Sequence, residues 1–519
     1  MKSNKQFFFF LLGILFLHAA CSGLLDEDPQ TFYNEDQIFS SEDGIESAVN
    51  GMYSQFSSGG YYGSAWHSFI APVSGKFWSS QGASTDATSL NTTPSNTWLV
   101  RLWPDMYSTI NTANVIIKNM EETEGTFSNR ETALGQAYFI RALTYFDLVR
   151  LFGGVPIRTT PTTADDLHIP RSSKAAIYDL VIADLERAKS LLPEPGTYRL
   201  ERPTPFTASA YLAKVYMTLA GEDASNASLW QNAYAEAFNV YQNGPYALTA
   251  TFAALFEPGN ENTVESIYEI QYGHTGGIRN SDMIRLYTPS NSTFVPENVV
   301  TFGRIRPNKE VFDTHISRYP DDPRIDATFI YGSYEKSGGG NQKIYPENTT
   351  GNNGYTAIRK WLDPTFNGIT TSRNFIHFRY ADLLLMLAEI ENELNGPDQA
   401  YQYVNQVLAR ARDTDGDGQS DTEQPADWSG LSKDEFRTSI LKERQFELLA
   451  EGHEWFDTRR RGYAYFLEEV VEPHNNHPTF DSGKDFIYPE SEKNMLLPIP
   501  LVEISGNQAI TPADQNPGY

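Results

Sequence analysis

Apolar residues recur every three or four positions along several long stretches of this chain, which is the spacing of one face of an α-helix. Each stripe covers one face only, so a helix that carries it must pack that face against a neighbouring element. The chain is therefore predicted to be mainly α-helical. The stripes lie within residues 106–120, 138–152, 177–188, 208–219, 234–241, 383–394 and 400–411.

Two regions contain two stripes joined by a short turn, namely residues 205–243 and residues 380–411. Pairs of helices of about 15 residues each are typical of tetratricopeptide-like repeats, which recur about every 34 residues. Long insertions separate the pairs, so a simple open solenoid is not expected. Ser432 and Glu435 have the spacing of a capping box, which predicts the start of a further helix. We predict a tetratricopeptide-like scaffold of helix pairs with long irregular loops and minor β-structure.

Three segments are rich in Gly, Ser, Thr and Asn: residues 54–97, 273–303 and 332–356. Long loops in a compact fold usually carry function. Trp66 and Trp78 both fall inside the first of these segments. The three segments are therefore predicted to be ligand-facing loops.

The N-terminus has the pattern of an export signal. Lys2 and Lys5 precede an apolar run over residues 7–17, which is too short to span a bilayer comfortably. Ala20 and the small residue before it lead to Cys21, the only cysteine of the chain. This order is typical of a bacterial lipoprotein signal, in which the cysteine receives acyl chains such as palmitate. The alternative is an ordinary secretory signal that is cut after Ala20.

Charge and composition exclude several function classes. The chain has 40 Lys and Arg against 66 Asp and Glu, a formal net charge of −26 at pH 7. Such a surface repels phosphate, which argues against nucleic-acid binding. A single cysteine allows neither an intrachain disulfide nor a thiolate zinc cluster. The sequence also lacks the zincin H-E-x-x-H, Walker A, G-x-S-x-G and dinucleotide-binding motifs.

Aromatic residues in the polar loops are the best candidates for a ligand site. An aromatic face can stack on the C–H face of a sugar ring, and neighbouring polar side chains can hold its hydroxyls. The alternative is that these aromatic side chains pack the loops onto the scaffold. The predicted ligand-binding residues are Trp66, Trp78, His67, Asp86, Tyr287 and Phe294.

An acidic segment at residues 413–421 resembles a calcium-binding loop. Its side chains take positions 1, 3, 5 and 9 of such a loop, position 7 would offer a backbone carbonyl, and Gly418 occupies the sharp turn at position 6. Position 12 is Gln424 rather than the usual glutamate, so the alternative is a solvated acidic turn. Calcium bound here would staple a loop, and no cofactor is otherwise required. The predicted ligands are Asp413, Asp415, Asp417, Gln419 and Asp421.

Several charged residues lie among apolar residues on the predicted helices. They could form an active-site cluster, but buried charges are usually paired, so we interpret them as ion pairs at helix crossings. His474 and His477 lie between prolines and are interpreted as surface-loop residues rather than metal ligands. The charged residues in question are Arg141, Arg379, Glu443, Arg444, Glu447 and Arg459.

Six stretches, taken together and in order, resemble the SusD/RagB family of nutrient-binding outer-membrane lipoproteins. Among them, Arg379-Tyr-Ala-Asp-Leu-Leu-Leu-Met-Leu-Ala-Glu is similar to the family's R-x-A-D-x-L-L-M-x-A-E helix. The stretches are the opening 24–53, the helix and turn at 135–156, the helix at 203–216, the helix at 379–393, residues 440–459, and the C-terminal residues 497–500 with 516–519.

The resemblance implies a tetratricopeptide-like fold with a loop-rich face. It also implies a protein without catalytic activity, anchored by lipid at the cell surface in the outer membrane, that captures glycan for a SusC-like TonB-dependent transporter. The alternative function is a secreted lipoprotein glycoside hydrolase that uses paired carboxylates. A scaffold without a ligand is a third possibility.

The expected organisation has four parts. Residues 1–20 are the signal peptide and residues 21–30 the tether. Residues 31–270 form an N-terminal helical region with ligand-facing loops. Residues 271–519 form a C-terminal region that contains the 380–411 helix pair and the 413–421 acidic loop.

Overall fold

The computed structural model describes residues 35–122, 127–223, 226–273, 280–368, 371 and 373–519. The predicted signal peptide and tether, with Cys21, lie outside these residues. None of the helices in the described ranges combines the length and apolar character needed to cross a bilayer.

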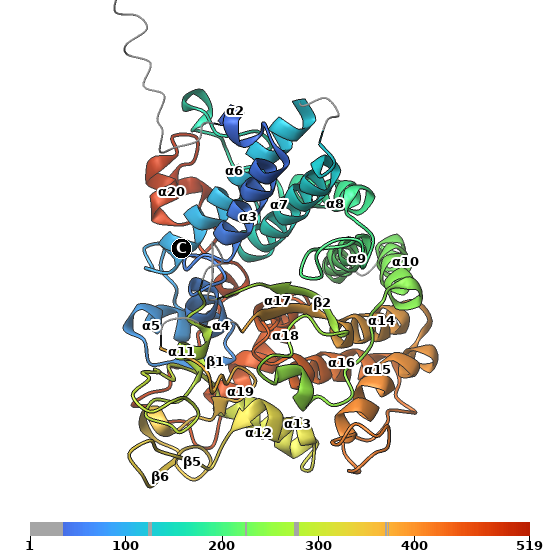
Figure 1. The fold of residues 1–519 in the computed structure, drawn as a ribbon. Coiled ribbons are helices and arrows are strands. Elements are labelled where there is room, and N and C mark those ends of the chain that lie inside the picture. Colours follow the sequence, from blue (N-terminus) through green and yellow to red (C-terminus); the bar gives the residue numbers. More distant parts are fainter. Residues whose placement is uncertain (1–34, 123–126, 224–225, 274–279, 369–370, 372) are drawn as a thin grey trace, which may run out of the picture.

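The N-terminal half is a row of helices in which each packs on the next (Figure 1). Helix α7 lies inside this row and is buried along almost its whole length. Residues on nearly all of its faces are therefore buried, and not only those of the predicted apolar stripe. In chain order the helices are α3 (Glu42–Phe56), α6 (Leu99–Glu122), α7 (Arg130–Phe152), α8 (Lys174–Leu191), α9 (Pro205–Glu222) and α10 (Ala227–Asn243).

The C-terminal half continues the row. Helix α14 (Tyr380–Asn395) packs on α10, on α15 (Pro397–Arg412) and on α16 (Lys433–Leu448). Both predicted helix pairs are therefore confirmed, as α9 with α10 and as α14 with α15. The predicted capping box is also present, because Ser432 and Glu435 bond each other's backbone N–H groups at the start of α16.

Short antiparallel strand pairs tie the loops together. The register Trp78↔Arg306 joins the first predicted loop to the strand that follows the second. The pairs are β1 (Phe77–Ser79) with β3 (Ile305–Pro307), β2 (Ser266–Ile270) with β8 (Phe375–Arg379), β4 (Phe329–Ile330) with β7 (Ala357–Ile358), and β5 (Ser333–Glu335) with β6 (Asn341–Lys343).

Short helices lie in the first two predicted loops and in other connections between the long helices. The expectation that residues 54–97 form an irregular loop is wrong in part, because a π-helical turn at Trp66–Ile70 and four further short elements interrupt it. Buried apolar side chains in this segment outweigh its polar composition. The short helices are α2 (Glu35–Ile38), α4 (Ala71–Val73), α5 (Thr85–Thr88), α11 (Met283–Tyr287), α12 (Lys309–Arg318), α13 (Pro323–Thr328), α17 (Glu454–Arg459), α18 (Tyr463–Phe466), a second π-turn (Leu467–Val471), α19 (Glu472–Asn475) and α20 (Leu501–Gly506).

Of the six charged residues named from the sequence, all but Arg459 are buried in ion pairs, as predicted. Arg379 is fully buried and contacts three glutamates, with Arg379 Nη1 2.8 Å from Glu265 and 2.7 Å from Glu447, and Nε 2.6 Å from Glu451. Arg459 differs, because its guanidinium donates to backbone carbonyls instead of a carboxylate. The other paired cations and their partners are Arg141 with Asp184, Arg324 with Glu443 and Glu447, and Arg444 with Asp382.

Candidate functional site

Trp66 lies in the core. Its side chain is 2% exposed, and its ring stacks on Tyr62 with centroids 4.4 Å apart. Gly452 fits against it so closely that a Cβ there would lie 2.9 Å from the indole nitrogen. The expectation that Trp66 offers an open face to a sugar is therefore wrong, because the rings of the scaffold already cover it.

Trp78 is also covered. It is 4% exposed, and Tyr355 stacks on its ring. The Trp78 indole N–H donates to the Lys484 carbonyl at 3.1 Å. The ring face of Trp78 contacts Tyr355 and its N–H contacts a backbone carbonyl, so neither is free for a ligand. The prediction that Trp78 binds a sugar is therefore wrong.

His67 and Tyr287 are buried as well, 1% and 2% exposed, with their rings edge to face. Burial lowers the pKa of His67 to about 3, so the imidazole is neutral at physiological pH. Neither side chain faces solvent, and their predicted contact with a ligand is overturned for the same reason.

Asp86 and Phe294 are half-buried and lie apart from this cluster. Asp86 organises its own loop, because its carboxylate accepts the Ala87 and Thr93 N–H groups at 2.9 and 3.1 Å. Phe294 packs near Tyr334, with ring centroids 6.1 Å apart. The six predicted residues therefore do not form one site, since large aromatic side chains anchor loops as readily as they bind ligands.

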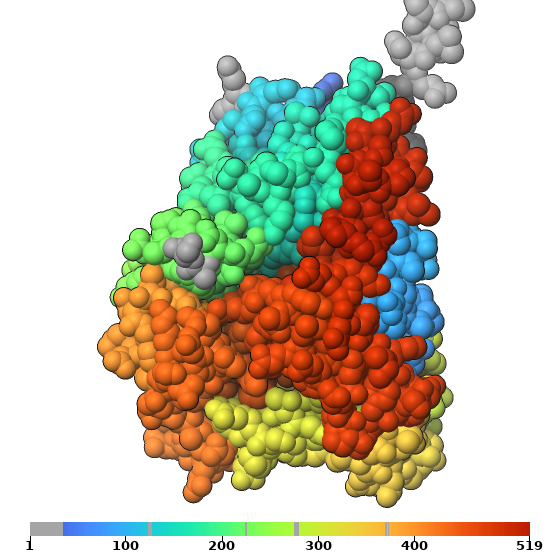
Figure 2. Space-filling model, turned by 180° about the vertical axis from the view of Figure 1, so that it is seen from behind, coloured from blue at the N-terminus to red at the C-terminus, as the bar shows by residue number. Residues whose placement is uncertain are grey.

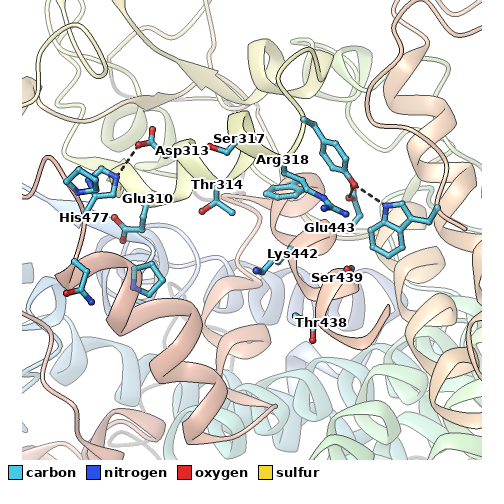
Figure 3. Close-up of a pocket in the computed structure, with 16 residues that line it drawn as sticks. Glu310, Asp313, Thr314, Ser317, Arg318, Thr438, Ser439, Lys442, Glu443 and His477 are labelled. Atoms are coloured by element: carbon cyan, nitrogen blue, oxygen red, sulfur yellow. Dashed lines mark hydrogen bonds and ion pairs between the residues drawn. The ribbon is translucent and has the colours of Figure 1, made fainter. Parts of the chain in front are cut away.

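A cleft of about 670 Å³ lies elsewhere, between α12, α16 and the chain that follows α19 (Figure 3). In Figure 2 it is the recess between the yellow segment and the orange-red segments. Its size is that of a typical small-molecule site. Its polar lining includes Asp313, Thr314, Ser317, Arg318, Thr438, Ser439, Lys442, Asn476 and His477.

Helical spacing places these polar side chains on one wall. On α12 the lining residues at 313, 314, 317 and 318 follow an i, i+1, i+4, i+5 pattern, which is one face of a helix. The opposite face of α12 carries Val311, Phe312 and His315, all buried. On α16 the residues at 438, 439, 442, 443 and 446 repeat the same spacing. Two amphipathic helices thus turn their polar faces toward one recess.

One end of the cleft is aromatic. The Trp428 indole N–H donates to the Tyr319 hydroxyl at 3.0 Å, and that hydroxyl donates to Glu443 Oε2 at 3.2 Å. Phe446 completes this end. Burial raises the pKa of Tyr319 to about 12, so its hydroxyl stays protonated and keeps its place in the chain of hydrogen bonds.

The other end is held by histidine–carboxylate pairs. His477 Nε2 lies 3.1 Å from Asp313, which also accepts the Tyr345 hydroxyl at 2.6 Å. His474 Nδ1 lies 3.0 Å from Glu310. Burial lowers the pKa of His474, but the charge of Glu310 and its hydrogen bond outweigh this, and the net change is upward. The interpretation of His474 as a surface residue is wrong, since it is 3% exposed and stacks on Tyr488.

Exposed donors lie between the two ends. Arg318 is exposed, with its guanidinium carbon 5.5 Å from the centre of the Tyr319 ring. Lys442 is half-buried and lies 3.2 Å from Glu469. Cations, carboxylates, hydroxyls and an amide therefore share the wall, which suits a ligand with many hydroxyl groups that both donate and accept hydrogen bonds.

The acidic loop brings three of its five predicted ligands together. Carboxylate oxygens of Asp413, Asp415 and Asp421 lie within 4.8 Å of one another. Asp417 is not one of this group, and its carboxylate accepts the Gln419 N–H at 2.7 Å. The loop thus has a geometry that a divalent cation could use, with Asp417 removed from the expected set.

Comparisons with known proteins fit this architecture. A family model described as the SusD family matches residues 228–519, and a second, described as starch-binding associating with outer membrane, matches residues 24–217. The chain is 29% identical over 562 residues to the SusD-like protein P2 of Formosa agariphila, with 100% of both chains covered.

Solved structures share the fold. A SusD homologue from Bacteroides thetaiotaomicron aligns with a TM-score of 0.78 at 20% identity, over 94% of this chain and 99% of that one. A laminarin-binding SusD-like protein aligns with a TM-score of 0.69 at 21% identity, over 92% of this chain and 100% of that one.

Proposed function

The chain belongs to the SusD family, and from that premise we propose that it is a glycan-binding protein of the outer membrane that passes oligosaccharide to a SusC-like TonB-dependent transporter. The proposal places the glycan in the cleft between α12 and α16. Cys21 would carry the lipid anchor that holds the protein at the cell surface.

The polar cleft is the observation that carries this proposal. Its volume of about 670 Å³ suits an oligosaccharide rather than a single small ion. The wall combines exposed donors such as Arg318 and Asn476 with the rigid aromatic end at Trp428. A laminarin-binding relative with the same fold supports a saccharide as the ligand.

Binding without hydrolysis fits the carboxylates of this cleft. A retaining hydrolase needs two carboxyl groups about 5–5.5 Å apart that are free to act as acid and nucleophile. Here Glu443 is held by Arg324 and Tyr319, and Asp313 is held by His477 and Tyr345. Carboxylates fixed in this way position a ligand more readily than they attack it.

A glycan panel tests the proposal. Native gels cast with laminarin, xyloglucan or starch measure retention, and a reducing-end assay on the same mixtures measures hydrolysis. We expect at least one polysaccharide to retard the protein without new reducing ends. New reducing ends would replace binding with hydrolysis, and retention by none of the glycans would contradict the proposed function.

A further inference from the structure

A second cleft, of about 550 Å³, lies where the ends of α7 and α9 and the start of α8 meet α17 and the residues after it. In Figure 2 the teal, green and orange-red segments that form it meet above the first recess. Its lining contains one carboxylate, that of Glu222. It also contains five cations, Arg150, Lys174, Arg459, Arg460 and Arg461. Four of them are ion-paired, Lys174 with Glu222 and the other three with carboxylates behind the lining, so Arg459 is the one without a carboxylate partner in the described residues.

Arg459 is the unusual member of this group. It is 7% exposed, and it donates hydrogen bonds to the carbonyls of Asn494 at 2.8 Å, Val73 at 3.0 Å and Ser74 at 3.2 Å and to the Thr458 hydroxyl at 2.9 Å. Its guanidinium also lies 3.4 Å from the centre of the Trp455 ring. Among the residues that the structure describes, none places a carboxylate within ion-pair distance of it. A buried cation without a counter-ion is costly, and burial lowers the pKa of Arg459 well below its usual range. An anion in the cleft would supply the missing counter-charge.

Two neighbouring guanidinium groups retain unused N–H donors. The Arg461 side chain reaches Glu389 through Nη2, while its buried Nε has no hydrogen-bonding partner within the described ranges. Arg150 donates through Nε to the Phe146 carbonyl and through Nη2 to Asp147. Rings of Phe146 and Phe456 hold the Arg150 guanidinium at 3.6 and 3.7 Å from their centres, which fixes its orientation.

We propose that this second cleft binds the anionic group of an acidic saccharide, either a carboxylate or a sulfate ester. The inference rests on the proposed function, because it assigns a charged sugar to a protein that binds glycans. Guanidinium groups match the planar and tetrahedral oxygens of these anions. The rings of Trp455 and Phe456 hold the guanidinium groups of Arg459 and Arg150, 3.4 and 3.7 Å from the ring centres, and so fix these cations at the cleft. Elsewhere the acidic surface would repel such a ligand.

Lys174 and Glu222 stand at the exposed part of this cleft and give a clean test. They form an ion pair of 2.7 Å, with side chains 43% and 39% exposed. Glu222 is the lining carboxylate that opposes an incoming anion. Removing its charge should favour binding, and removing the charge of Lys174 should weaken it, while neither change disturbs the core.

The experiment is calorimetry at low ionic strength with glucuronate, glucose 6-sulfate, glucose and inorganic sulfate. We expect the two acidic sugars to bind better than glucose and better than inorganic sulfate. Lys174→Gln should weaken their binding roughly three- to tenfold and Glu222→Gln should strengthen it by a similar factor. Lys118→Gln is the matched control, since Lys118 also forms an exposed ion pair, 3.8 Å from Glu35, away from this cleft.

Three results would overturn the inference: equal binding of glucose and the acidic sugars, no response to either variant, or binding of inorganic sulfate alone. Retention by neutral glycans without binding of acidic sugars would end this inference and leave the proposed function standing. If the acidic sugars bind in a manner that depends on Lys174 but none of the polysaccharides retains the protein, the inference stands and the proposed function is contradicted.

Discussion

Trp78 and Tyr355 stack with their ring centroids 4.4 Å apart and their planes 14° apart. The face that a sugar would need is occupied by a side chain of the protein itself. Tyr355 is held in turn by a hydrogen bond from its hydroxyl to Asp485 at 2.5 Å. The stack joins the loop at β1 to the segment before β7. Trp78 therefore stabilises the packing of these two loops and does not contact a ligand.

Replacement of Trp78 by alanine is expected to act on stability. Loss of a large buried aromatic side chain should lower the free energy of unfolding by about 3–5 kcal/mol. Trp78→Phe, which keeps a ring against Tyr355, should cost less. Urea denaturation followed by circular dichroism measures both. Unchanged stability together with lost glycan retention would show that Trp78 contacts the ligand after all.

Glu454 should make the protein less stable as the pH rises. Burial raises the pKa of its carboxyl from 4.5 to about 7. Between these values the unfolded chain releases a proton that the folded chain retains, so stability falls as pH increases through this window and stays low above it. Glu454→Gln should therefore stabilise the protein by about 3 kcal/mol at pH 8 and have little effect at pH 4.

The glutamine at this position is a conservative test. The Glu454 carboxyl oxygen accepts the Ala450 N–H, and a glutamine oxygen can accept the same bond. Denaturation midpoints of wild type and variant at pH 4, 6 and 8 give the comparison. An equal effect of the variant at all three values would mean that the carboxyl does not titrate in this window.

Calcium is expected to bind the loop that contains Asp413, Asp415 and Asp421. Added CaCl2 should give a heat of binding in calorimetry and raise the melting temperature with the logarithm of its concentration above the dissociation constant. Asp415→Ala should remove both effects. Asp417→Ala is the matched control, because that carboxylate stands outside the group. Absence of any heat with the wild type would identify the segment as a solvated acidic turn.

Cys21 is expected to carry the lipid anchor. Cys21→Ser should release the protein from the membrane fraction of a host that processes lipoproteins, because the acyl chains that provide the membrane affinity are lost. Incorporation of labelled palmitate before and after the change measures the modification directly. Equal labelling of both forms, or none in either, would favour an ordinary secretory signal.

Local patterns in the sequence predict the scaffold well. Helical periodicity identifies α9 with α10 and α14 with α15, because the spacing of an apolar face depends only on the helix itself. The apolar stripe at 208–219 lies inside α9, which runs from Pro205 to Glu222. Pairing of buried charges such as Arg379 also follows from the sequence, since a charge among apolar residues needs a partner.

Long-range contacts limit what the sequence could predict about the site. Trp66 sits in a polar segment, but Gly452 and Tyr62 cover it, and nothing in the local pattern identifies that cover. The cleft is formed by α12, α16 and residues 473–478. In the sequence, the polar residues of each segment have the pattern of an ordinary solvent-exposed surface, so nothing indicates that they meet. The pairing of His477 could not be predicted from the sequence either, because its partner Asp313 is distant in the chain.

The most direct test of the account is the affinity of the double variant Arg318→Ala/Asn476→Ala for whichever polysaccharide retains the wild type. Both side chains are exposed in the cleft, so the fold should survive, and circular dichroism verifies it. Arg101→Ala is the matched control, an exposed arginine 5.4 Å from the ring of Trp98, outside the cleft. Loss of charge-assisted hydrogen bonds predicts affinity lower by roughly tenfold or more in the double variant and unchanged in the control. Equal affinity of all three proteins would contradict the assignment of the glycan to this cleft.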